Sequence, residues 1–195
     1  MAHSQKDNAV AIPGHGYILI GDDVDTTTQP TLADINAFVA DISDLPTGWK
    51  NLGHTDIDEI LTFGQEGGET EVKRSWQNEA LRETITETAV DFFTVQSLQL
   101  IDNDVLSLFY GGGDATVADE FSLPDTSAVT EKPALVILVD ATNGNPSFYC
   151  PKTSIRRDAE IGMAFDDWVK LPLRFTVLQK SGAKRGKWLH ASLGA

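Results

Sequence analysis

The stretch EVKRSWQNEALRETITET, from Glu71 to Thr88, has two conflicting hydrophobic and polar periods. Leu81, Ile85 and Ala89 recur at every fourth position, which favours a helix. The three threonines that follow Glu83 recur at every second position, which favours a strand. The local pattern does not choose between the two, so the rest of the sequence has to decide.

The bulk composition predicts one globular domain. The chain has 195 residues, of which 41% are hydrophobic and 23% are charged, and this is ordinary globular usage. With Cys150 as the only cysteine, no disulfide can form within the chain, which fits a reducing compartment. The first 16 residues lack the basic flank and the long apolar stretch of a signal peptide, so none is expected. The longest aliphatic run, Ala134 to Val139, is too short for a membrane span, so no membrane partner is expected.

The charge is strongly negative and unevenly spread. Residues 1–130 hold 5 basic and 23 acidic residues, a net charge of −18, whereas residues 131–195 hold 10 and 6, a net charge of +4. Such an acidic chain is not expected to bind nucleic acid, because phosphate binding needs a cationic surface. The asymmetry could give electrostatic complementarity between copies of the chain, or it could serve solubility alone.

Short apolar runs between turn signals predict a mainly β fold, a sandwich or a barrel. Residues 64–68, which include three glycines, predict a turn that joins two strands into a hairpin. We expect strands at 17–20, 61–63, from about 69, 89–100, 134–139, 148–155, 159–165 and 171–178.

One short helix is expected at about 102–110, within IDNDVLSLFYGGG. Asp102 or Asn103 can cap its first turn, and Gly111 can end it. Val105, Leu108 and Phe109 fall on one face, as they would in a helix that packs on a sheet.

The predicted organisation has three parts. Residues 1–16 form an N-terminal arm, 17–180 form a single β-sandwich domain, and 181–195 form a basic C-terminal tail. Within the domain we expect a long loop at 21–60 and a second loop at 111–133. Leu32, Ile35 and Val39 have helical spacing, so the first loop could hold a short helix near 31–40.

The sequence lacks the motifs of an enzyme or a cofactor site. The four histidines (His3, His15, His54 and His190) lack metal-ligand spacing, and one cysteine does not make a zinc site. The run from Asp102 to Asp104 starts like a calcium loop but lacks the later Gly and Glu. No phosphate loop or Gly-x-Ser-x-Gly elbow is present. We therefore expect no enzyme, no metal and no cofactor, although a pair of carboxylates acting as acid and base stays an open alternative.

Three ordered segments resemble the major tail tube proteins of long-tailed bacteriophages, particularly those that infect actinobacteria. PTGWKNLGHTDID (46–58) is similar to the segment that follows the N-terminal arm in that family. EVKRSWQNEALRETITETAVDFFTVQSLQLIDNDVLSLFYGGG (71–113) resembles its core, a Trp-Gln-Asn turn followed by strands and a helix. FYCPKTSIRR (148–157) and WVKLPLRFTVL (168–178) resemble its closing strands.

The resemblance implies a structural virion protein of the phage tail. In this family, subunits form rings, generally of six, that stack into a hollow tube around a tape-measure protein. A tail-tip initiator and a tail terminator bound the tube, which is assembled in the host cytoplasm, and phage DNA passes through it without specific binding. The alternative is a monomeric β-sandwich that binds or decorates a virion.

The resemblance also decides the opening stretch, because the family has strands after the Trp-Gln-Asn turn. Residues 80–98 are then mainly strand. Acidic residues four apart share one face of a continuous strand, and this face could line the tube lumen and repel DNA phosphate. Apolar side chains of the same face favour the alternative of an outer face. The lumen candidates are Glu79, Glu83, Glu87 and Asp91.

The long segment 21–60 is expected to reach an adjacent copy, as arms and loops do in tube proteins. A buried tryptophan is a common anchor of such contacts, and the alternative is that Trp49 packs on its own domain. The contact candidates in this segment are Trp49, Leu52, Asp56, Asp58 and Glu59, and the basic candidates on the neighbour are Arg156, Arg157, Lys184, Arg185 and Lys187.

Overall fold

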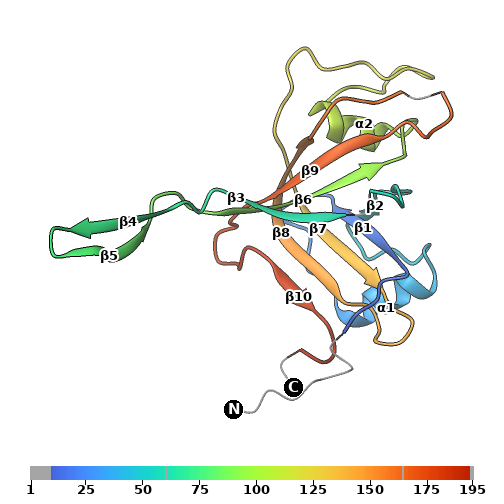
Figure 1. Ribbon diagram of the computed structural model, residues 1–195. Coiled ribbons are helices and arrows are strands. Elements are labelled where there is room, and N and C mark those ends of the chain that lie inside the picture. Colours follow the sequence, from blue (N-terminus) through green and yellow to red (C-terminus); the bar gives the residue numbers. More distant parts are fainter. Residues whose placement is uncertain (1–9, 60, 164, 194–195) are drawn as a thin grey trace.

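The chain folds around an antiparallel β-sheet of eight strands, from which a separate two-stranded hairpin projects (Figure 1). A computed structural model describes residues 10–59, 61–163 and 165–193. The first nine residues of the expected N-terminal arm and the last two of the expected tail lie outside the described residues.

Every strand pair in the sheet is antiparallel, and the strand order is β2-β1-β7-β8-β9-β6-β3, with β10 beside β8. The bounds are β1 His15–Gly21, β2 Trp49–Asn51, β3 Thr62–Glu66, β6 Val90–Ser97, β7 Thr130–Val139, β8 Ser147–Arg157, β9 Leu171–Val177 and β10 Lys187–Leu189. The hairpin consists of β4 Thr70–Ser75 and β5 Asn78–Ile85.

Strand β8 bends the sheet, because its two halves have different neighbours. Ser147–Tyr149 pairs with β10, whereas Thr153–Arg157 pairs with β9. The side chains on one face of all these strands therefore meet in one core. There Phe93 of β6 stacks on Phe175 of β9 with ring centroids 4.6 Å apart, in the same cluster as Ile18 of β1. The expected mainly β fold is confirmed.

Helix α2 (Asn103–Tyr110) closes the end of this core. The Asp102 carboxylate accepts a hydrogen bond from the Val105 amide at 3.1 Å, which caps the first turn as expected. The helix ends at Gly111, whose φ of 70° is left-handed. A side chain on Gly111 would also come within 2.4 Å of the Ala128 carbonyl oxygen, so glycine is required here on two grounds.

A second helix, α1 (Leu32–Ala40), covers the other face of the sheet (Figure 1). Thr31 and Asp34 form a reciprocal capping box at its start. Ile35 and Phe38 are buried against Leu135 and Ile137 of β7. The sequence indicated this helix only as one possibility. Its apolar positions Leu32, Ile35 and Val39 pack against the sheet, because strands β1 and β7 carry apolar side chains on both faces.

Several local predictions are wrong. The expected hairpin across residues 64–68 does not form: β3 pairs with β6, and β4 pairs with β5. Gly67 and Gly68 both have positive φ, and they turn the chain out of the sheet. Residues 159–163 and 165–169 form no strand. The segment 21–60 holds α1, at the place where the sequence allowed a helix, together with β2, and the tail holds the short strand β10.

Candidate assembly surfaces

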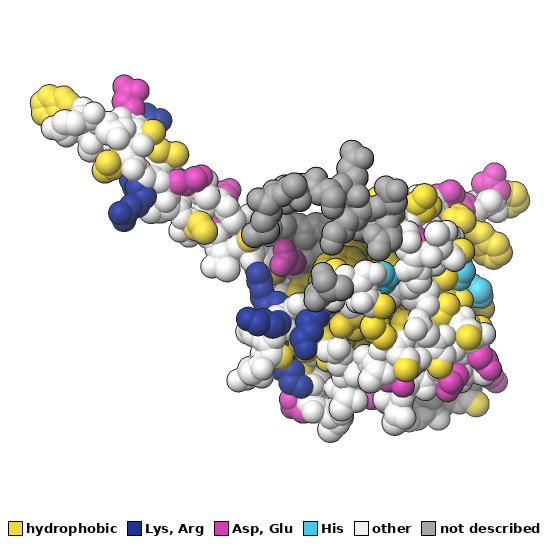
Figure 2. All heavy atoms as spheres, turned by 90° about the horizontal axis from the view of Figure 1, so that it is seen from below, with side chains coloured by type: hydrophobic (Ala, Val, Ile, Leu, Met, Phe, Trp, Pro, Cys, Tyr) yellow, Lys and Arg dark blue, Asp and Glu magenta, His cyan; other side chains and the backbone are white. Residues whose placement is uncertain are grey.

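The β4–β5 hairpin projects from the body and pairs with no strand of the main sheet (Figures 1 and 2). Its turn is formed by Trp76 and Gln77, close to the position that the sequence predicted. Trp76 is 98% exposed at the tip. Because a two-stranded hairpin alone is marginally stable in water, and because its apolar side chains are uncovered, this element is suited to a contact with another molecule.

The register gives the hairpin two different faces. Val72 pairs with Glu83, and Lys73 pairs with Arg82, and residues that oppose one another in an antiparallel pair lie on the same face. One face is therefore apolar and acidic, and the other is polar and basic. The first face carries Val72, Glu79, Leu81, Glu83 and Ile85, and the second carries Glu71, Lys73, Ala80, Arg82 and Thr84.

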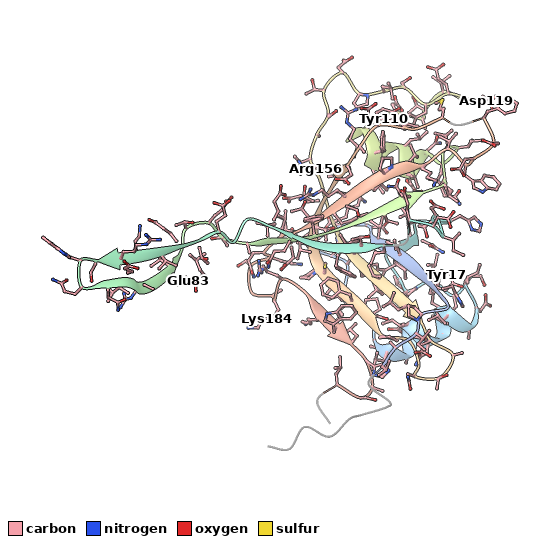
Figure 3. All side chains as sticks on the ribbon, viewed as in Figure 1. Tyr17, Glu83, Tyr110, Asp119, Arg156 and Lys184 are labelled. Carbon is pink, nitrogen blue, oxygen red and sulfur yellow. The ribbon has the colours of Figure 1, made fainter. Side chains whose placement is uncertain are left out.

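The four lumen candidates do not lie on one strand. Glu79 and Glu83 belong to β5, Glu87 lies in the link after it, and Asp91 belongs to β6 (Figure 3 labels Glu83 on the hairpin). Asp91 lies in the main sheet, 3.7 Å from the Arg185 guanidinium. The premise of one continuous strand is wrong, because the chain leaves the strand conformation between Ile85 and Val90; whether these residues line a lumen stays a prediction.

Trp49 and Leu52 lie in the interior of their own subunit, which favours the alternative that Trp49 packs on its own domain over a contact with an adjacent copy. Trp49 is 4% exposed. Its indole N–H donates to the Thr28 carbonyl at 3.1 Å, and its ring meets the Tyr149 ring edge to face. The physical reason is that the segment 21–60 folds back on the sheet through α1 instead of extending from it.

Asp56 is also buried, where it holds an ion pair within the chain. It is 7% exposed, and its Oδ2 lies 2.6 Å from the Lys170 ammonium. This contact is the main reason why the pKa of Asp56 lies below its usual value. The pair ties the loop after β2 to the start of β9. Of this expected contact segment, Asp58 and Glu59 remain exposed.

Asp140 anchors the N-terminal segment to the β7–β8 turn. Its carboxylate accepts hydrogen bonds from the amides of Ile12 at 2.8 Å, Thr142 at 2.8 Å and Asn143 at 3.2 Å. These amide donors hold the pKa of Asp140 below its usual value, the Ile12 amide first among them. The Asn143 carbonyl also contacts the His190 ring, so one turn holds segments from both ends of the described chain.

Acidification is expected to lower the stability through these two carboxylates. A group whose pKa is depressed in the folded state stabilises the fold above its unfolded pKa, about 3.9 for Asp. That contribution is lost as the pH falls through the folded pKa. The denaturant concentration at the unfolding midpoint should therefore stay constant between pH 7 and pH 5. It should decrease when the pH is lowered below about 4. Asp140→Asn should flatten this fall, and an unchanged slope in that variant would contradict the assignment.

Basic side chains gather beside the base of the hairpin (Figure 2). Arg185 donates to the Ala89 carbonyl at 3.3 Å, and Lys187 donates to Gln29 at 3.0 Å. Arg156 and Arg157 are exposed at the end of β8. Figure 3 places Arg156 and Lys184 on different sides of the hairpin's base, so the basic candidates at the end of β8 and those in the tail form two separate groups.

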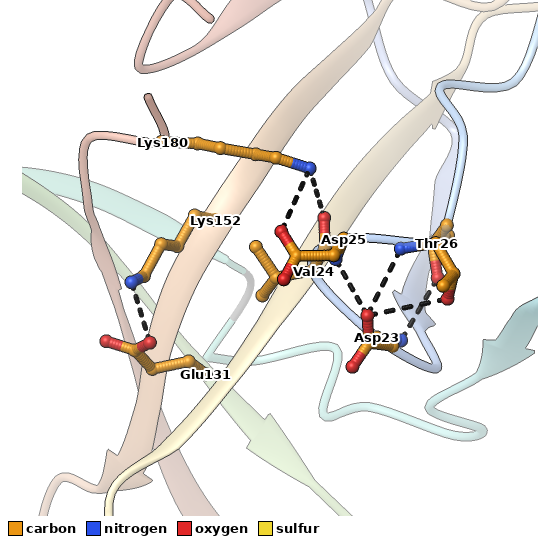
Figure 4. A network of polar contacts seen from close by, with 8 residues as sticks. Asp23, Val24, Asp25, Thr26, Glu131, Lys152 and Lys180 are labelled. Carbon is orange, nitrogen blue, oxygen red and sulfur yellow. Dashed lines mark hydrogen bonds and ion pairs between the residues drawn. The ribbon is translucent and has the colours of Figure 1, made fainter. Parts of the chain in front are cut away.

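Part of the charge asymmetry is used within the subunit (Figure 4). Lys180 contacts the Val24 carbonyl and lies 3.9 Å from the Asp25 carboxylate, and Lys132 donates to the Asp22 carbonyl at 2.9 Å. The pair of Lys152 with Glu131, 2.7 Å apart, lies within the basic part of the chain. Asp23 accepts hydrogen bonds from the amides of its own loop. The basic C-terminal third thus holds the acidic loop after β1 in place.

A second exposed apolar group lies on the β8–β9 loop, at the opposite side of the body from the hairpin (Figure 1). Met163, Phe165 and Trp168 are all exposed there, and Ile57 is exposed in the loop before β3. A pocket of about 360 Å³ lies in this region. Its lining includes Met163, Trp168, Glu59, Glu160, Asp167 and Lys170. This surface was not predicted from the sequence, although a loop with Met, Phe and Trp within six residues indicates an exposed apolar surface.

The described residues hold no group of three or more His, Cys, Asp or Glu side chains that could bind a metal ion. None of the helices that the structure describes is long and apolar enough to cross a membrane.

Comparison with known proteins gives matches over nearly the whole chain. Residues 3–195 match the model of a family described as phage tail tube protein. The chain is similar to the major tail protein Gp23 of Mycobacterium phage D29, with 33% identity over 97% of this chain and 95% of that protein. It is also similar to the major tail protein Gp23 of Mycobacterium phage L5, with 34% identity over 97% and 95%.

Proposed function

Because the chain belongs to the phage tail tube protein family, we propose that it is a structural subunit that assembles with copies of itself into stacked rings, generally of six, forming the hollow tail tube. It is a structural tail component and not an enzyme, in keeping with relatives that are named major tail proteins. The subunits assemble in the host cytoplasm around a tape-measure protein, between a tail-tip initiator and a terminator. Phage DNA passes through the tube without specific binding.

The observation that carries the proposal is the projecting β4–β5 hairpin. It exposes Val72, Trp76, Leu81 and Ile85 to solvent and stands apart from the core of its own subunit. An uncovered apolar arm does not stabilise a monomer, and its exposed apolar side chains promote aggregation. A neighbour that covers the arm makes it an interface, and the likeness to major tail proteins supports a second copy of the chain as that neighbour.

The acidic balance of the chain supports passage of DNA without binding. A net charge of −14 repels phosphate wherever acidic side chains face the lumen. We propose Glu79, Glu83, Glu87 and Asp91 for this role, and Asp58 and Glu59 with Arg156, Arg157, Lys184, Arg185 and Lys187 as contacts between subunits. An assembly in which Glu83 and Glu87 point away from the lumen would remove them from this role.

The test is negative-stain electron microscopy of the purified protein beside size-exclusion chromatography. We expect hollow rings or tubes after concentration, or on addition of a tail-tip initiator, because a stack of head-to-tail contacts grows once it is started. A protein that stays a monomer at high concentration with the initiator present would contradict the proposal and favour the binding or decoration module.

A further inference from the structure

The tip of the hairpin has the form of an anchor. Trp76 has nearly its whole side chain in solvent, and tryptophan is one of the residue types that are enriched in binding hot spots. Around it lie Lys73, which is paired with Glu71, and Arg74 and Arg82, against one acid, Glu79, so the two arginines leave the tip of the hairpin basic. Arg74 and Arg82 form no ion pair with any residue that the structure describes.

The pocket on the β8–β9 loop has the opposite character. Its apolar lining comes from Met163 and Trp168, and its charged lining is three acids, Glu59, Glu160 and Asp167, against Lys170. Lys170 is already paired with Asp56 and Asp167. Glu59 and Glu160 form no ion pair within the described residues. The volume of about 360 Å³ falls in the range that encloses a group larger than one side chain.

The hairpin and the pocket lie on opposite sides of the body. In Figure 1 the hairpin leaves the body on the left, and the β8–β9 loop lies at the upper right. Strand β5 has eight residues, so the hairpin extends roughly 27 Å at 3.4 Å per residue. It points away from its own pocket and cannot fill it, but it can fill the same pocket on a second copy.

We propose that Trp76 of one copy inserts into the pocket between Met163 and Trp168 of the next copy, with Arg74 and Arg82 facing Glu59 and Glu160. This inference rests on the proposed function and names the contact through which it works. The contact is heterologous, since the two surfaces differ, and it either closes into a ring or continues as a stack. Glu79 then lies at this contact, and the lumen role falls first to Glu87 and Asp91.

Disulfide trapping tests the contact directly. Gln77→Cys places a thiol beside the anchor, and Gly162→Cys places one in the pocket, where a side chain at Gly162 meets nothing within 4 Å. The native Cys150 does not interfere, because burial raises its pKa to about 12 and shields it from oxidants. Mixing the two singly substituted proteins under mild oxidation should give a disulfide-linked dimer.

The matched control pairs Gln77→Cys with Ser181→Cys, an exposed position in the segment before β10, and should give no dimer. Trp76→Ala should raise the concentration needed for assembly at least about thirtyfold, as expected for a hot spot, whereas Ile101→Ala, an exposed position outside both the hairpin and the pocket, should change it little. Arg74→Glu should weaken assembly, and Glu160→Arg in the same chain should restore it, since each contact then regains opposite charges.

The outcomes separate this inference from the proposed function. If the wild type forms tubes, the Gln77→Cys and Gly162→Cys proteins give no disulfide link and Trp76→Ala still assembles, the contact is overturned and the tube function stands. A wild-type protein that forms no ring or tube under any of the conditions above would overturn both. Trapping at 77 and 162 together with loss of assembly in Trp76→Ala establishes the contact.

Discussion

A chain in which residues 70–85 are replaced by two glycines is expected to fold and to lose assembly entirely. Thr86 donates to the Glu69 carbonyl at 2.9 Å, so the two ends of the excised segment are already adjacent and two residues can join them. No residue of the hairpin belongs to either apolar core. Thermal unfolding should therefore shift by only a few degrees, because surface changes away from the core have small effects.

The readouts for the shortened chain are circular dichroism for the fold and electron microscopy with size-exclusion chromatography for assembly. Adding the shortened chain to the wild type should also stop tube growth, because it offers a pocket but no hairpin. The idea fails if the shortened chain still forms tubes. A loss of the folded state would instead show that the hairpin supports its own subunit.

Trp49→Ala is expected to destabilise the subunit by about 3–5 kcal/mol, the usual cost of removing a buried Trp or Phe side chain. The change empties a site between α1, β2 and Tyr149 and leaves the Thr28 carbonyl without its indole donor. For a chain of this size the melting temperature should fall by roughly 10 °C. Loss of assembly in this variant would follow from loss of the fold.

Trp168→Ala is the matched control, with the same residue type at a position that is 73% exposed. It should change the free energy of unfolding by less than about 0.5 kcal/mol and still weaken assembly. Urea unfolding of both variants separates the two roles. A Trp49→Ala protein that keeps wild-type stability and loses only assembly would reverse the assignment of Trp49 to the core.

Local sequence patterns predicted the elements whose own residues carry a complete signal. The α2 helix has a cap at Asp102, an apolar face and a terminal glycine at Gly111 within ten residues, so its ends follow from local chemistry. The strands β6, β7, β8 and β9 carry runs of β-branched, aromatic and aliphatic residues long enough to be recognised without their partners. The charge balance predicts that the chain does not bind nucleic acid, and the sequence contains none of the common catalytic motifs.

Pairing and exposure were decided only by the tertiary structure. The link at Gly67 and Gly68 has the composition of a hairpin turn, yet the chain leaves the sheet there. The reason is that β3 pairs with β6 instead of β4, and Phe63 of β3 packs on Phe93 of β6. Trp49 and Trp76 have similarly polar neighbours in the sequence. In the structure, however, Trp49 is buried in the core and Trp76 is exposed at the tip of the hairpin.

What separates the two tryptophans is whether a second element arrives to cover them. Trp49 is covered by the loop at Thr28, by Tyr149 of β8 and by the cluster that includes α1, whereas Trp76 is 98% exposed. Such cover comes from segments distant in sequence, whose approach depends on the packing of the whole chain rather than on local propensity. The sequence alone therefore determined the kind of elements and the class of protein, and the packing decided which side chains remain for a neighbouring copy.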